Sequence, residues 1–157
     1  MGDLKDPVEV SEIDWQAVWT LAANGFVLDG HSFHGPDHWQ RVERNALEIV
    51  ADSGGDVTVV RLFAVLHDSQ RLNEGSDPEH GLRAANWAKH LRNVHFTLDD
   101  VRFSQLTEAC IWHDTGNVSD DPTIGTCWDA DRLDLPRVGI QPIRRFMSTA
   151  YGKSRAT

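Results

Sequence analysis

The chain has 157 residues and a formal net charge of −9; 40% of its residues are hydrophobic and 25% are charged. This length suits a single domain with a real core, and the composition is that of a globular rather than a disordered protein. The acidic balance argues against a broad nucleic-acid interface or an anionic-membrane surface. With no basic-then-apolar signal and no apolar run near the roughly 20 residues of a membrane span, a cytoplasmic protein is expected.

The apolar spacing predicts an all-α fold, a single helical bundle of about six to seven helices over residues 1–157, with no convincing strand. The expected helices, in chain order, cover about 12–24, 36–52, 57–67, 78–92 and 98–113, and a sixth carries 127–135. Polar segments with glycine or proline separate them. A last short amphipathic piece contains Ile143, Phe146 and Met147, and the tail after Tyr151 is expected to fray.

Three of these helices begin with capping residues. Ser11 with Asp14, and Thr97 with Asp100, resemble capping boxes, in which side chains satisfy the free backbone N–H groups of the first turn. Asp77 precedes a proline and is the expected N-cap of the fourth helix. These residues set the predicted starts of the first, fourth and fifth helices.

The eight histidines are the unusual feature of the composition, and their positions matter more than their number. On five helices, an apolar stripe at helical spacing ends near an inward imidazole or carboxylate. The residues at these positions are His38, His67 with the adjacent Asp68, His80, His113 and Asp131. The histidines without such a placement, interpreted as loop or surface residues, are His31, His34, His90 and His95.

One histidine on an apolar face is more often a core residue bonded to a backbone carbonyl than a metal ligand. Five inward positions in one small domain are harder to explain in that way, since each unpaired buried polar group costs about 1–3 kcal/mol. A divalent cation satisfies neutral imidazoles and ionised carboxylates together. The pattern therefore favours a metal site between helices.

Three segments then resemble the HD-domain superfamily of metal-dependent phosphohydrolases, over roughly residues 30–140. They are "HGPDHWQRV" around His38, "LFAVLHDS" with His67 and Asp68, and "DADRLDL" near the sixth helix. The resemblance implies an all-α fold with the metal held between helices. It also implies hydrolysis of a phosphomonoester or phosphodiester, on nucleotides in many members. It puts the closing metal ligand at Asp131, with Asp129 as the fallback.

"DPEHG" and "CIWHD" resemble the extra histidine segments of HD members with a second metal. On that interpretation His80 and His113 hold a second cation, bridged to the first through Asp68. Alternatively, they orient water or phosphate beside a single metal, with Asp68, His80 and His113 as the catalytic groups. The expected cofactor is one or two divalent ions per chain, from among Mn, Fe, Co, Ni, Zn and Mg.

The expected partner is a small phosphate ester, with nucleotides among the candidates; a homodimer is left open. Arg71, Arg83 and Arg132 are the candidates for gripping the phosphate through the guanidinium fork. Two other functions compete. A diiron oxygenase resembling myo-inositol oxygenase uses a similar ligand set. A non-catalytic, metal-stabilised regulatory module is the second alternative, against which the complete ligand set argues.

Overall fold

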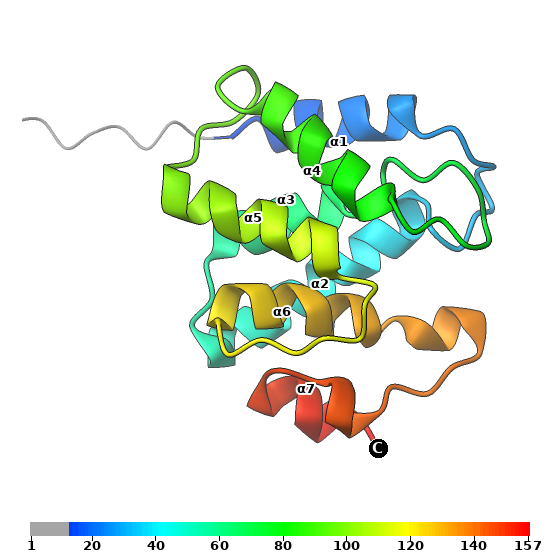
Figure 1. Cartoon of the computed structure of the whole chain (residues 1–157), viewed down its shortest axis with the longest axis vertical. Coiled ribbons are helices and arrows are strands. Elements are labelled where there is room, and N and C mark those ends of the chain that lie inside the picture. The colour runs from blue at the N-terminus through cyan, green and yellow to red at the C-terminus, as the bar shows by residue number, and fades with distance from the viewer. Residues whose placement is uncertain (1–12) are drawn as a thin grey trace, which may run out of the picture.

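The computed structural model describes residues 13–157, which form seven α-helices and two short 3-10 turns without a β-strand (Figure 1). In chain order the elements are α1 Trp15–Gly25, α2 Pro36–Ser53, α3 Val57–Leu66, α4 His80–Leu91, α5 Asp100–Trp112, α6 Pro122–Arg132, η1 Leu135–Val138, η2 Arg144–Phe146 and α7 Ala150–Arg155. The predicted all-α bundle of six to seven helices is confirmed. In the described part of the chain, no helix combines the length and apolar character needed to cross a membrane.

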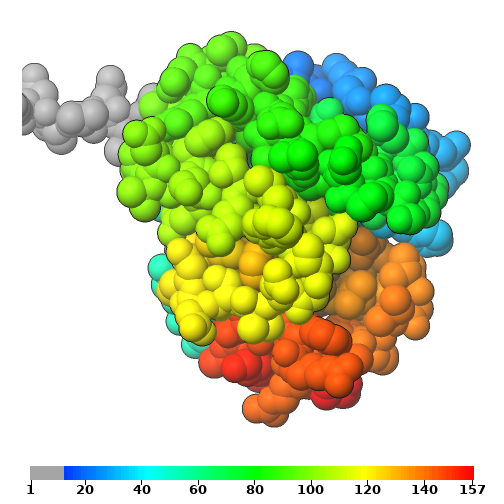
Figure 2. All heavy atoms as spheres, in the orientation of Figure 1, coloured from blue at the N-terminus to red at the C-terminus, as the bar shows by residue number. Residues whose placement is uncertain are grey.

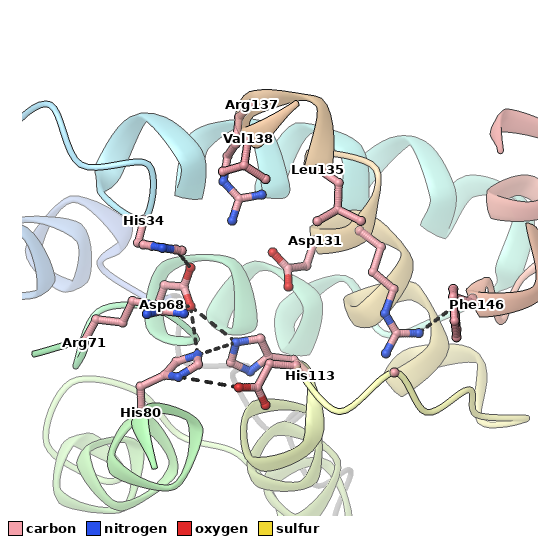
Figure 3. A pocket seen from close by; sticks show the side chains of 13 residues that line it. His34, Asp68, Arg71, His80, His113, Asp131, Leu135, Arg137, Val138 and Phe146 are labelled. Atoms are coloured by element: carbon pink, nitrogen blue, oxygen red, sulfur yellow. Dashed lines mark hydrogen bonds and ion pairs between the residues drawn. The ribbon is translucent and has the colours of Figure 1, made fainter. Parts of the chain in front are cut away.

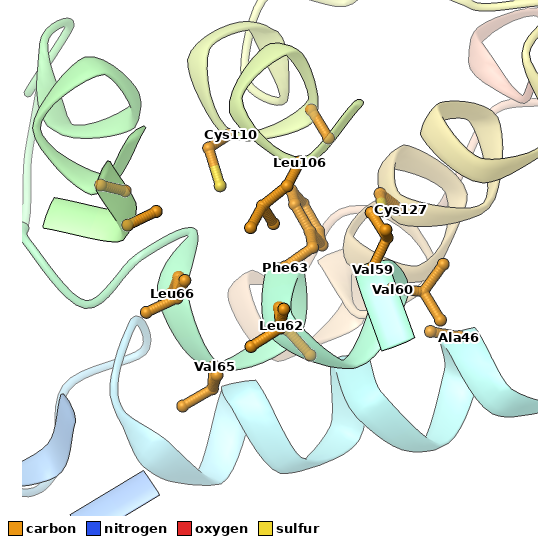
Figure 4. Close-up of a cluster of buried hydrophobic side chains, with 14 of the residues drawn as sticks. Ala46, Val59, Val60, Leu62, Phe63, Val65, Leu66, Leu106, Cys110 and Cys127 are labelled. Atoms are coloured by element: carbon orange, nitrogen blue, oxygen red, sulfur yellow. The ribbon is translucent and has the colours of Figure 1, made fainter. Parts of the chain in front are cut away.

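Helix α3 lies at the centre of the bundle, where α2, α5 and α6 pack around it. Seven of its ten residues are buried, as expected of a largely apolar helix. Figure 4 shows Phe63 pointing toward Leu106 of α5, with Cys127 of α6 close by. The side chain of Asp56 caps its first turn by accepting a hydrogen bond from the Val59 N–H at 2.9 Å. The last turn of this buried helix leads directly into His67 and Asp68.

Helix α2 is amphipathic and lies along α3 and α6. Its buried stripe consists of His38, Trp39, Val42, Ala46 and Ile49. Pro36 opens the helix, where a missing N–H is tolerated, and Gly54 ends it in the left-handed conformation at φ 75°. The polar member of the stripe, His38, therefore sits at the N-terminal end of an otherwise apolar face.

Helices α4 and α5 pack closely because Gly81 has no side chain. A Cβ at this position would overlap the carbonyl oxygen of Cys110 on α5. Small residues continue the contact face along α4, where Ala84, Ala85 and Ala88 are buried. The first turn of α4 is thus held against the last turn of α5, and this brings His80 to the same place as the end of α5.

The C-terminal segment is ordered, contrary to the expectation of a frayed tail after Tyr151. Residues 150–155 form α7, which packs beneath α6 and α2 (Figures 1 and 2). The carboxylate of Asp129 accepts hydrogen bonds from the Ser148 and Thr149 backbone N–H groups, both at 2.7 Å. It also accepts one from the Thr149 hydroxyl at 2.7 Å. Thr149 is the N-cap of α7, since its side chain accepts from the Gly152 N–H at 2.9 Å. The support that the distant Asp129 carboxylate gives to this capping segment cannot be recognised from local sequence.

Two predicted helix starts are wrong by two residues. Helix α4 begins at His80, because the side chain of Asp77 accepts the Leu72 N–H and pairs with Arg83 instead of capping the helix. Helix α5 begins at Asp100, with Asp99 as its N-cap, so the predicted box starting at Thr97 is not formed. At the first helix Asp14 caps by accepting the Ala17 N–H, while Ser11 lies outside the described residues. The sixth helix ends at Arg132, earlier than predicted, and a 3-10 turn follows.

We expect Gly81→Ala to destabilise the fold by about 1–3 kcal/mol, the usual cost of inserting a methyl group into a closed packing contact. The added methyl group meets a backbone carbonyl, which cannot rotate away as a flexible side chain could. Denaturant unfolding of the chelator-treated protein measures the change. Gly25→Ala is the matched control, since nothing lies within 4 Å of a Cβ at that helical position. Equal stability of the two variants would contradict the close-packing argument.

Candidate metal centre

Four imidazoles from four helices converge at one end of α3, and each is oriented by an acceptor at its Nδ1 atom. His38 Nδ1 lies 2.6 Å from Asp134 Oδ2. The other acceptors are backbone carbonyls. His67 Nδ1 lies 3.0 Å from the oxygen of Ala64, His80 Nδ1 lies 2.5 Å from that of Asp77, and His113 Nδ1 lies 2.7 Å from that of Cys110. Carbonyls and carboxylates only accept, so the Nδ1 atoms donate and the Nε2 atoms keep their lone pairs.

These Nε2 atoms meet in pairs. His38 Nε2 and His67 Nε2 are 3.1 Å apart, and His80 Nε2 and His113 Nε2 are 2.9 Å apart. Two lone pairs at such distances repel each other unless a positive charge lies between them. Imidazoles whose Nδ1 atom is held by an acceptor and whose Nε2 atom is free are the usual arrangement of metal-ligating histidines. The paired Nε2 atoms therefore indicate two places for a cation.

The first group of candidate ligands consists of His38, His67, Asp68 and Asp131. Oδ2 of Asp68 lies 3.4 Å from His38 Nε2 and 3.6 Å from His67 Nε2. Oδ1 of Asp131 lies 3.0 Å from His38 Nε2 and 3.4 Å from His67 Nε2. Two ligands about 2.1 Å from one metal are separated by about 3.0 Å at a right angle and about 3.4 Å at the tetrahedral angle. The measured separations match ligands that share one ion.

The second group consists of Asp68, His80 and His113, and it uses the other carboxylate oxygen of Asp68. Oδ1 of Asp68 lies 3.2 Å from His80 Nε2 and 3.3 Å from His113 Nε2. Asp68 is buried, and its two oxygens lie close to both pairs of imidazoles; Figure 3 shows it beside His80 and His113. One carboxylate thus contributes an oxygen to each group, the arrangement expected of a bridge between two cations. His38, His67 and Asp68 form one buried cluster positioned to bind a metal ion, and Asp68, His80 and His113 form another.

The charges around the centre favour a cation between the imidazoles. Burial opposes protonation of His38, but the neighbouring carboxylates of Asp131 and Asp134 raise its pKa to about 10. Burial also opposes ionisation of Asp68, yet the neighbouring imidazole of His67 holds the pKa of this carboxyl well below its usual range. The same balance keeps the pKa of Asp131 well below its usual range. Protons and metal ions compete for such a site, so metal affinity decreases as the pH falls.

The contacts of Asp131 and Asp129 distinguish which of them is the candidate ligand from α6. Asp131 Oδ1 is buried and has no hydrogen-bond partner in residues 13–157, although His38 Nε2 is close. A buried carboxylate oxygen without a hydrogen-bond donor is unfavourable unless a cation compensates its charge. The fallback residue, Asp129, is turned away, and its two oxygens accept from the Ser148 and Thr149 N–H groups just before α7. The geometry therefore favours Asp131 over Asp129 as the ligand from α6.

Sequence reasoning missed Asp134, which supports the first group from behind. Its carboxylate accepts from His38 Nδ1 and from Arg41 Nε, the latter at 2.8 Å. A carboxylate behind a ligating imidazole fixes the ring and increases the basicity of the ligating nitrogen. Asp134 follows Asp131 by three residues, the spacing that puts two side chains on one face of a helical turn. That spacing was the available signal.

The second missed residue is His34, which lies in a loop as predicted but not at the surface. Its Nδ1 atom lies 3.3 Å from Asp68 Oδ2. The loop backbone is fixed on both sides, since the His34 N–H donates to Ser32 Oγ at 3.0 Å and its carbonyl accepts from Trp39 Nε1 at 2.7 Å. Its separation of four residues from His38, just before the proline that opens α2, was the only hint in the sequence.

A cavity of about 350 Å³ opens beside the two groups (Figure 3). Both groups contribute to its wall, together with His34, Arg71 and Arg132. The third predicted phosphate contact, Arg83, is not among the lining residues. Its Nη2 atom lies 2.6 Å from both carboxylate oxygens of Asp77, and its Nε atom donates to the carbonyl of Gln70 at 3.1 Å. Arg83 holds the start of α4 in place and is not retained as a phosphate contact.

No family model matches the chain, and neither a curated protein nor a solved structure matches it. Membership of the HD-domain superfamily therefore stays a prediction from the three sequence segments. The function has to be inferred from the geometry of the site itself.

We expect Asp131→Asn and Asp129→Asn to separate metal binding from folding. The Asp131 variant should bind less metal because the first group loses a charged ligand, while its fold is retained. The Asp129 variant should keep its metal but lose about 1–3 kcal/mol of stability, because an amide N–H₂ then faces backbone donors. Metal analysis and denaturant unfolding of both variants measure the two effects. The opposite assignment of effects would make Asp129 the ligand.

Alanine variants of His80 and His113 test the second group. If this group holds a cation, each variant should lower the metal content from about two per chain to about one, since the first group is untouched. His90→Ala is the control, because His90 is an exposed histidine on the same helix as His80. Metal is quantified after equilibration of all proteins with the same excess of ion. Unchanged content in both variants would remove the second cation and leave His80 and His113 as groups that orient water or phosphate.

Proposed function

We propose that the protein is a metal-dependent phosphohydrolase that cleaves a phosphate ester of a small molecule. One observation carries this proposal. Within residues 13–157, three buried side-chain polar atoms lack a hydrogen-bond partner, and all three belong to residues that line the same cavity. They are Asp131 Oδ1, Arg71 Nε and Arg132 Nη2.

These three atoms would be stabilised by ligands of opposite charge. A carboxylate oxygen without a partner is satisfied by a cation, whereas unpaired guanidinium N–H groups are satisfied by an anion. Phosphate is the anion that arginine recognises best, and it also coordinates divalent metals. A phosphate ester in this cavity, together with a cation at the metal groups, would bring both signs of charge beside these three residues.

The two arginines are held ready for this role. Arg71 Nη1 donates to the carbonyls of Asn73 and Gly75 at 3.2 and 3.0 Å, and its Nε atom lies 3.8 Å from Asp68 Oδ1. Arg132 Nη1 donates to the carbonyl of Phe146 at 2.6 Å. Each guanidinium is therefore anchored through one nitrogen while another stays free. Groups positioned before the ligand arrives cost little reorganisation in the transition state.

His38, His67, Asp68 and Asp131 would hold the first cation, and Asp68, His80 and His113 the second. A divalent cation bound there lowers the pKa of a coordinated water and offsets charge on the phosphoryl oxygens. Asp68 contributes one oxygen to each group and so fixes the position of the two groups relative to each other. His34 contacts this carboxylate and fixes its tilt. Arg71 and Arg132 orient the ester so that the phosphorus faces the ligand groups. Asp134 keeps His38 in the tautomer that presents Nε2.

The chelator-treated protein should not hydrolyse phosphate esters, and activity should return with Mn, Co, Ni, Fe, Zn or Mg. Arg71→Gln should lower kcat/KM by about 10- to 100-fold, the effect of losing one charge-assisted hydrogen bond to phosphate. Arg44→Gln is the control, since Arg44 is an exposed residue of α2 away from the cavity. Phosphate release from a broad ester panel is measured with each metal. Oxygen consumption by the iron-loaded protein, with no phosphate release across the panel, would favour the diiron oxygenase instead.

A further inference from the structure

We propose that the preferred substrate is a compact phosphomonoester with an apolar organic group, rather than a nucleotide. This inference rests on the proposed function, because it concerns the same cavity. It concerns the part of the substrate that does not react. The evidence comes from the size of the cavity and from the side of it that faces away from the candidate ligands.

The cavity is small. Its volume of about 350 Å³ lies near the lower end of ligand pockets, which span about 300–1,000 Å³. A phosphate group with a short organic chain fills this space. A nucleoside monophosphate needs room for a sugar and a base in addition to its phosphate.

The wall opposite the metal groups is apolar. It is built by Leu135 and Val138 of η1 and by Phe146 of η2. In Figure 3, Leu135 and Val138 lie on one side of Asp131, and His80 and His113 lie on the other. Val138 and Phe146 are 40% and 36% exposed, so their side chains face a space that no other residue fills. A bound apolar group would remove this surface from water.

Neutral polar side chains are missing from this wall. Among the lining residues of the described chain there is no Asn, Gln, Ser, Thr or Tyr. These are the side chains that read the edge of a base or a sugar hydroxyl by hydrogen bonds. Arg132 and Arg137 also line the cavity on this side, and each donates to backbone carbonyls. The two ends of the cavity thus fit the two ends of an apolar phosphate ester.

The wall is also fixed in position. Arg137 donates from Nε to the carbonyl of Phe33 at 2.7 Å and from Nη1 to the carbonyl of Asp134 at 3.0 Å. These bonds tie η1 to the loop that carries His34. Arg132 holds η2 through the carbonyl of Phe146. The apolar wall is therefore part of the folded scaffold and limits the length of the organic group.

Binding of alkylphosphonates, which are not hydrolysed, tests this inference independently of catalysis. Methyl-, ethyl-, propyl- and butylphosphonate and adenosine 5′-monophosphate are titrated into the metal-loaded protein in a calorimeter. We expect affinity to increase about fourfold per methylene until the cavity is full. Val138→Ser should flatten this increase and leave methylphosphonate binding unchanged. Ile140→Ser is the control, because Ile140 is exposed outside the cavity.

The outcomes separate the inference from the proposed function. Affinity that does not change with chain length, or tighter binding of the nucleotide than of every alkylphosphonate, overturns the inference while phosphate-ester hydrolysis can still be observed. Failure of all phosphonates to bind also overturns it. A chain-length increase that survives in Val138→Ser would place the organic group elsewhere. Absence of phosphate release from the ester panel, with chain-length-dependent binding intact, would reject the hydrolase and keep the apolar anion site.

Discussion

The repulsion between paired imidazole nitrogens is the constraint on which the rest of this site depends. A buried core histidine is normally satisfied once one ring nitrogen has found an acceptor. Here His38, His67, His80 and His113 all have that acceptor, and their second nitrogens still face each other at 2.9–3.1 Å. The carboxylate of Asp68 between the pairs adds negative charge. Only a positive charge, a proton or a metal ion, makes this arrangement favourable, and the geometry suits an ion.

The fold supplies this arrangement through two packing features rather than through flexible loops. The last two turns of α3 are buried apart from Arg61, so the helix delivers His67 and Asp68 to the interior with the helical hydrogen bond from the His67 N–H to Phe63 intact at 2.9 Å. The bare backbone of Gly81 lets α4 approach α5, which sets the distance between His80 and His113. Rigid helices hold such ligands more accurately than loops do. The precision of the site is therefore a result of core packing.

The sequence was sufficient for the features that depend on helical spacing. Inward stripes identified the helices and the six residues of the two groups, because an apolar helix face and its polar end are encoded locally. It was insufficient for contacts between residues that are far apart in the sequence. Asp134 reaches His38 over 96 residues, and Asp129 binds the two residues before α7 over 19 and 20 residues. His34 was expected to be a loop or surface residue because its contact with Asp68 spans 34 residues. Arg83 was predicted as a phosphate contact, but its guanidinium is paired with Asp77.

One turn of α6 links the metal side of the cavity to its apolar side. Side chains advance by about 100° per residue along a helix, so near neighbours in sequence face different parts of the molecule. Asp129 faces the start of α7 and binds the Thr149 N–H, Asp131 faces the imidazoles, and Arg132 lies between the cavity and the carbonyl of Phe146. The C-terminal segment is thereby tied to the helix that supplies a candidate ligand. The apolar wall of the cavity is positioned by hydrogen bonds between distant residues, and such bonds produce no sequence motif. The sequence therefore suggests the chemistry of the site but not the shape of its substrate.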